Sequence, residues 1–90
     1  MLRFIFDPVK EAENLRKHGV PFADAEGVFY DALALHASDP DAQGEDRSMA
    51  IGLGSAGQIL VVIYTMRGEE VVRLISVRGA ARREARAYAG

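Results

Sequence analysis

Two almost unbroken β-strand segments, residues 58–66 and 70–78, constrain the fold of this chain more than any other feature. Both are rich in Val, Ile and Leu, which pack well on a pleated sheet. The turn around Gly68 that separates them is too short for a crossover helix, so we expect the strands to pair antiparallel. Residues 58–66 are apolar on both faces, which predicts a central strand.

The segments before this hairpin predict a short strand and two helices. A strand at residues 2–6 is followed by a first helix, which Asp7 caps and Gly19 stops. A second short helix runs from Pro21 to about Asp31.

From residue 32 the hydrophobic period becomes that of strands, and residues 80–88 form a closing helix. The order β-α-α-β-β-β-β-α indicates a single α+β domain over residues 1–90. We expect an antiparallel sheet of about four to five strands, two N-terminal helices and one C-terminal helix. A sheet that is apolar on both faces, covered by three short helices, should leave an apolar surface for a partner.

Cationic charge is concentrated near the C-terminus. The formal net charge is −2, but residues 65–90 hold six arginines against three glutamates, whereas residues 1–64 hold five Lys and Arg against ten Asp and Glu. Arginine binds phosphate through two parallel hydrogen bonds and keeps its charge, so the pattern favours RNA or DNA as a ligand. The alternative is a solvated helix face with ordinary surface arginines.

Composition indicates a cytoplasmic protein. The chain has no cysteine, which excludes disulfides and thiolate metal sites. Its longest apolar run, residues 59–64, is far shorter than the ~18 residues that cross a bilayer. Asp7 interrupts any signal peptide. We therefore expect no membrane association.

Three segments carry a resemblance that extends over almost the whole chain. They are Phe4–Lys10 with Asn14–Phe22, then Gly44–Arg47 with Ile51–Gly52 and Gly57–Val62, and finally Thr65–Arg67 with Arg73–Arg78 and Arg83–Glu84. In this order and at these separations they resemble the BrnT-type toxins, small RelE-like ribonucleases of bacterial type II toxin–antitoxin modules. The resemblance implies a RelE-like fold and an endoribonuclease that cleaves RNA to inhibit translation. It also implies a hetero-oligomer with a ribbon-helix-helix antitoxin of BrnA type.

RNA cleavage needs no metal if the 2′-OH attacks the neighbouring phosphate. A base then removes the 2′-OH proton, cations stabilise the phosphorane, and an acid protonates the leaving 5′ oxygen. Neither His18 and His36 nor the acidic loop at residues 39–46 shows the spacing of a metal site. We expect neither metal nor cofactor.

Arg78 is the leading candidate for the phosphate clamp, because it ends a core strand that fixes its backbone. Arg67 supports it, and so does Arg73. Period two puts Arg73 and Arg78 on opposite faces unless the strand twists or bulges near Arg78. For each arginine the alternative is a surface side chain whose stem covers apolar atoms. The further RNA-binding candidates are Arg73, Arg47, Arg82, Arg83 and Tyr88.

Three side chains are candidates for proton transfer: Lys17, His18 and Glu84. Lys17 and His18 end the first helix, where the dipole favours cations, and this explanation suffices for both. Glu84 could instead orient an arginine, and Tyr88 could stack on a base or pack in the core. A second function remains open at this point, a non-catalytic module that binds nucleic acid or a partner and keeps only the antitoxin interface.

Overall fold

The computed structural model describes residues 1–42 and 46–90. Residues 43–45 lie outside this part, and with them Gly44 and Glu45 of the central resembling segment. The elements are β1 (Arg3–Ile5), α1 (Pro8–His18), the 3₁₀ helix η1 (Phe22–Tyr30), β2 (Leu35–Ser38), β3 (Ser48–Leu53), β4 (Ile59–Arg67), β5 (Val71–Gly79) and α2 (Arg82–Ala89). No helix in the described ranges is long and apolar enough to cross a membrane.

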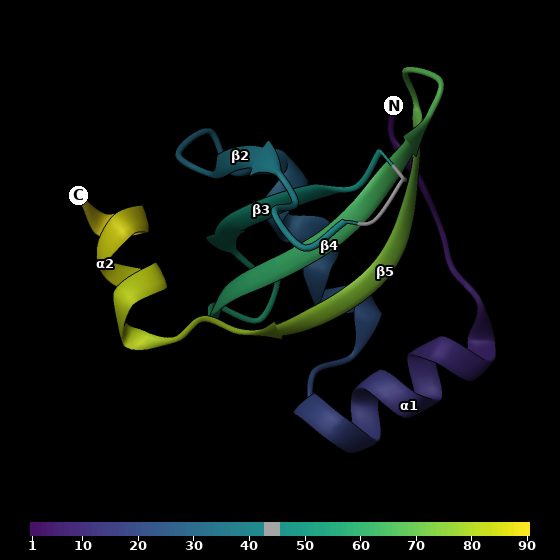
Figure 1. The fold of residues 1–90 in the computed structure, drawn as a ribbon, viewed down its shortest axis with the longest axis horizontal. Helices are drawn as coiled ribbons and strands as arrows, with labels where there is room; N and C mark the ends of the chain where they lie inside the picture. The colour runs from purple at the N-terminus through teal and green to yellow at the C-terminus, as the bar shows by residue number, and fades with distance from the viewer. Residues whose placement is uncertain (43–45) are drawn as a thin grey trace.

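The strands form one five-stranded sheet in the order β1-β5-β4-β3-β2. Figure 1 shows β2 to β5 of this sheet, with α1 to one side and α2 at one end. The α+β class with five strands and three helices agrees with the sequence prediction. The expectation of a purely antiparallel sheet was wrong, because β1 pairs parallel with β5, with Phe4 opposite Val72. Residues 6–70 connect these two strands, so no tight turn imposes an antiparallel direction.

Local signals at both ends of α1 produce the helix that they predict. The Asp7 side chain accepts a hydrogen bond from the Val9 N–H at 2.9 Å, and Pro8 occupies the first turn. At the other end Gly19 adopts a φ of 71°, and its N–H donates to the Leu15 carbonyl at 2.8 Å. The bounds predicted for this helix are confirmed.

The second helix is a 3₁₀ helix, which suits its apolar pattern. Its buried residues are Phe22, Ala25 and Val28. They recur every third residue, and a helix with 3.0 residues per turn aligns such positions on one face. That face packs on the sheet and forms the core with alternate residues of β4, among them Leu60 and Val62.

Strand β5 contains a bulge that changes which of its side chains face the core. Tyr64 pairs with Leu74, but Ile63 pairs with Ser76, so Ile75 has no partner opposite. The buried positions of β5 consequently run Val72, Leu74 and then Val77. Because the bulge shifts the alternation of side chains, Arg73 and Arg78 both lie on the face away from the core. The sequence prediction allowed this only if the strand twisted or bulged, and the structure has a bulge.

Asn14 joins α1 to the outer edge of β5. Its side chain is polar, but the residue is buried, with only 7% of its surface exposed. Its Nδ2 donates to the carbonyls of Val77 at 2.8 Å and Val20 at 3.3 Å, while its Oδ1 accepts from the Val77 N–H at 3.1 Å. β1 pairs with β5 only from Val71 to Arg73, so the Asn14 amide replaces a neighbouring strand where β1 has ended.

Candidate functional site

A groove of about 410 Å³ lies near the hairpin that joins β4 to β5. Its lining residues are Lys10, Asp46, Arg47, Thr65, Met66, Arg67, Arg73 and Ile75. Four of these side chains are cations and one is a carboxylate, so the groove favours an anionic ligand.

Strand register brings the groove residues together. Leu60, Val62 and Tyr64 face the core, so Thr65 and Arg67 project from the opposite face of β4. Arg73 lies directly across from Thr65 on β5. Lys10 from α1 and Arg47, which precedes β3, complete the lining.

Several groove cations have no carboxylate partner in the described part of the chain. The ion pairs found within residues 1–42 and 46–90 join the N-terminus to Glu70 and Arg78 to Glu84. None of them involves Lys10, Arg67 or Arg73. These three charges are therefore not neutralised by a described residue, and a bound anion would compensate them.

Thr65 contributes a hydroxyl that lacks a hydrogen bond. Its Oγ1 is buried, and within residues 1–42 and 46–90 it has no partner. An unsatisfied buried polar group costs about 1–3 kcal/mol, so such groups are rare in folded proteins. Thr65 is one of the residues that line the groove, and it lies across from Arg73.

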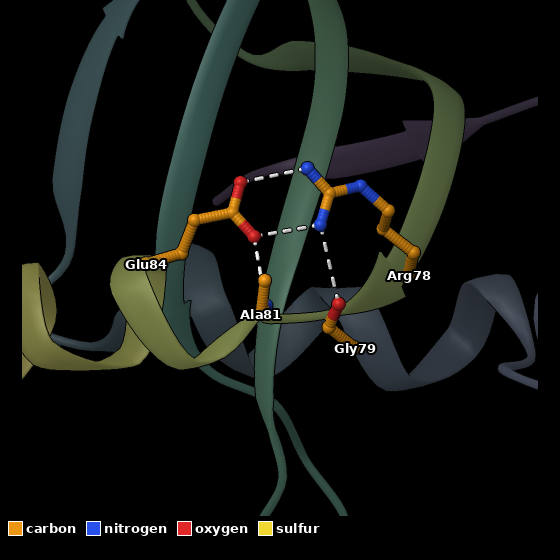
Figure 2. A network of polar contacts seen from close by, with 4 residues as sticks. All are labelled: Arg78, Gly79, Ala81 and Glu84. Carbon is orange, nitrogen blue, oxygen red and sulfur yellow. Dashed lines mark hydrogen bonds and ion pairs between the residues drawn. The ribbon is translucent and has the colours of Figure 1, made fainter.

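Arg78 forms a different site, at the start of α2. Figure 2 shows its guanidinium facing the Glu84 carboxylate. Nη1 donates to Glu84 Oε1 and Nη2 to Glu84 Oε2, each at 2.7 Å. Glu84 Oε1 also accepts from the Ala81 N–H at 2.8 Å, which is half of a capping box. The hydrogen bond from Arg78 lowers the pKa of Glu84 to about 2, and Glu84 raises the pKa of Arg78.

Arg78 and Arg67 do not meet, contrary to the expectation that they share one phosphate. Arg78 pairs with Val61, six residues along β4 from Arg67, which corresponds to ~20 Å of strand. The bulge puts Arg78 on the same face as the groove, but at the opposite end of the strands. The Arg78 guanidinium forms an ion pair with Glu84, and Arg78 does not line the groove.

The proton-transfer candidates at the end of α1 also lie outside the groove. Lys17 is exposed and His18 half-buried, in the last turn of the helix. Lys17 lies seven positions after Lys10, which is ~10 Å of helix. The other histidine, His36, hydrogen-bonds through Nδ1 to the Tyr64 hydroxyl at 2.9 Å. In the described residues no group of three His, Asp or Glu side chains could hold a metal ion.

Tyr88 fastens the C-terminal helix to the body of the protein. Its hydroxyl donates to Asp31 Oδ2 at 2.7 Å. The same carboxylate accepts from the N–H groups of Leu33 and Leu53, each at 2.9 Å. The Tyr88 hydrogen bond lowers the pKa of Asp31 most, and Asp31 in turn raises the pKa of Tyr88.

The structure thus separates the predicted site residues into two groups. The groove contains Arg47, Arg67 and Arg73. The candidates outside it are Arg78, Lys17, His18, Glu84, Arg82, Arg83 and Tyr88. Sequence reasoning missed Lys10, Asp46 and Thr65. All three lie in resembling segments, which was a usable signal, but the unsatisfied hydroxyl of Thr65 has no sequence signature.

Acid is expected to loosen α2, because the Arg78–Glu84 pair fastens it. The folded pKa of Glu84 is about 2 against its usual 4.5, so the carboxylate stabilises the folded state above pH 4.5 and loses this effect as the pH falls towards 2. Arg78 is 37% exposed and water screens the pair, so we expect only about 1 kcal/mol. Urea unfolding of wild type and Glu84→Gln should show a difference at pH 7 that shrinks towards pH 2. A difference independent of pH would contradict this assignment.

The chain matches known proteins over most of its length. The family profile described as "Ribonuclease toxin, BrnT, of type II toxin-antitoxin system" matches residues 6–84. The fold is similar to the crystal structure of the Brucella abortus ribonuclease toxin BrnT, with 32% sequence identity and a TM-score of 0.71 over 91% of this chain and 100% of that chain. No curated protein matches the sequence. The chain belongs to the family of BrnT ribonuclease toxins of type II toxin–antitoxin systems.

Proposed function

We propose that this toxin is a metal-independent endoribonuclease and that the groove binds the scissile phosphate of RNA. The observation that carries the proposal is the set of cations on the groove, of which Lys10, Arg67 and Arg73 have no described carboxylate partner. Family membership supports RNA as the anion. The remaining parts of the proposal are a RelE-like fold, action in the cytoplasm on translation, and neutralisation by a BrnA-type ribbon-helix-helix antitoxin.

The groove residues can be assigned to the steps of cleavage. Among the described groove residues, Asp46 is the one that carries a carboxylate. This carboxylate accepts the proton of the 2′-OH as the 2′ oxygen attacks phosphorus. Arg67 and Arg73 stabilise the charge of the phosphorane. The bond from phosphorus to the 5′ oxygen then breaks, and Lys10 donates a proton to that oxygen. The products are a 2′,3′-cyclic phosphate and a 5′-OH end.

Incubation of the purified chain with end-labelled RNA in EDTA tests this reaction. Cleavage should persist in EDTA, and the 3′ ends of the products should carry the cyclic phosphate. A rate that falls to background in EDTA and returns with Mg²⁺ would rule out the metal-independent route. RNA that binds but stays intact under all conditions would favour the non-catalytic binding module.

Thr65 offers a test that separates binding from stability. Thr65→Val keeps the shape of the side chain and removes the unsatisfied hydroxyl, so we expect the free energy of unfolding to rise by about 1 kcal/mol. The same change removes a donor to the bound phosphate, and RNA affinity should fall about fivefold. Thr65→Ser is the matched control and should keep the affinity. Urea unfolding and fluorescence anisotropy measure the two effects, and unchanged affinity in Thr65→Val would remove the hydroxyl from the site.

A further inference from the structure

The C-terminal helix α2 is attached to the body of the protein by polar contacts. None of its residues is buried. Its inward side holds two side chains that reach the body, Glu84 on Arg78 and Tyr88 on Asp31. Figure 1 shows α2 at the end of β4 that lies opposite the β4–β5 hairpin, and therefore away from the groove.

The other side of α2 carries three exposed arginines. At 100° per residue, Arg82, Arg83 and Arg86 lie within one ~100° arc, opposite the side that holds Glu84 and Tyr88. Among the described residues none of the three has a carboxylate partner.

Their positions weaken the helix. Arg82 and Arg83 occupy the first turn, where the helix dipole disfavours cations, and Arg82 and Arg86 are a like-charged pair four residues apart. These arginines therefore do not stabilise the free protein. An anionic partner lying along this face of α2 would offset both unfavourable effects.

Exposed leucines lie near α2. Leu33 is 72% exposed, and Leu35 and Leu53 are each 43% exposed. Asp31 connects Leu33 and Leu53 to α2, because the carboxylate that binds Tyr88 also binds the N–H groups of these two residues. Leu35 belongs to β2, the edge strand of the sheet. The basic face of α2 and the three leucines are called the α2 surface below.

We propose that the α2 surface is the docking site for an acidic, amphipathic segment of the antitoxin. Charge complementarity selects carboxylates for the three arginines. The leucines select apolar side chains, which a phosphate backbone does not offer, so a peptide fits the whole surface and a nucleic acid only part of it. A toxin of a type II system implies a protein antitoxin, which makes such a peptide available. The site is separate from the groove that the proposed function assigns to RNA.

Binding of the antitoxin of this toxin's own module, measured by isothermal titration calorimetry, tests the proposal. Arg86→Glu and Leu33→Glu each alter an exposed side chain outside the groove, so both variants should fold and cleave RNA as wild type does. Each should weaken antitoxin binding at least about tenfold, Arg86→Glu through charge repulsion and Leu33→Glu through loss of an apolar contact. Arg16→Glu, an exposed cation of α1, is the matched control and should change affinity less than about twofold.

Several outcomes would overturn the proposal. Unchanged antitoxin affinity in both variants would place the interface elsewhere. Weakened RNA binding together with unchanged antitoxin affinity would make the α2 surface part of an RNA site. Equal weakening by Arg16→Glu would show that only overall charge matters. Failure of the proposed nuclease activity is seen separately, as intact RNA with the wild-type protein.

Discussion

Replacing Arg67 and Arg73 together by alanine is expected to lower the rate of RNA cleavage by at least ~100-fold, since removing one preorganised donor to a developing oxyanion commonly costs ~100-fold to 1,000-fold. Both guanidinium groups line the groove, and neither has a described carboxylate partner. The effect should appear in single-turnover cleavage of end-labelled RNA with EDTA present.

Two further variants show whether such a loss is specific. Arg16→Ala removes an exposed cation of α1 and should keep the wild-type rate. Arg78→Ala distinguishes the groove from the site expected from sequence, because Arg78 is held by Glu84 at the other end of the strands. We expect its rate to fall less than about threefold, a small effect for a residue outside the groove. A larger loss in Arg78→Ala than in the double variant would contradict the groove assignment.

Replacing Asn14 by alanine is expected to lower the free energy of unfolding by about 3 kcal/mol. The amide makes three buried hydrogen bonds to backbone groups, and their loss leaves the N–H of Val77 and the carbonyls of Val77 and Val20 without these partners. Urea denaturation followed by circular dichroism measures the change.

Two controls test the reason for this loss. Glu13→Ala alters an exposed neighbour on the same helix and should leave stability within about 0.5 kcal/mol of wild type. Asn14→Asp keeps the shape but removes the donor and buries a charge, so it should destabilise at least as much as alanine at pH 7. If Asn14→Ala unfolds at the same urea concentration as wild type, the amide does not hold α1 to β5.

Local signals predicted the elements of this fold better than their pairing. Asp7 and Gly19 act through bonds within a few residues, so the ends of α1 could be read from the sequence. The parallel pairing of β1 with β5 joins residues almost seventy positions apart, and no local pattern encodes it. The bulge at Ile75 is similarly hidden, because a run of β-branched residues looks the same with or without an extra residue.

The candidate site shows the same division. Clustering of arginine near the C-terminus predicted Arg67 and Arg73, and both line the groove. Antiparallel pairing of two strands joined by a tight turn already places Arg67 beside the turn and Arg78 at the far end, a consequence that the clustering of charge obscured. Lys10 arrives from α1 and Thr65 is identified by its unsatisfied hydroxyl, and both facts depend on the folded arrangement.

A crystal structure of the chain with a short RNA that carries a 2′-deoxy substitution at the cleavage position would test the groove most directly. The substitution removes the nucleophile and leaves the phosphate intact. We expect a phosphate in the groove, within hydrogen-bonding distance of the guanidinium groups of Arg67 and Arg73 and of the Thr65 hydroxyl. A phosphate bound beside Arg78 or along α2, with the groove empty, would contradict this expectation.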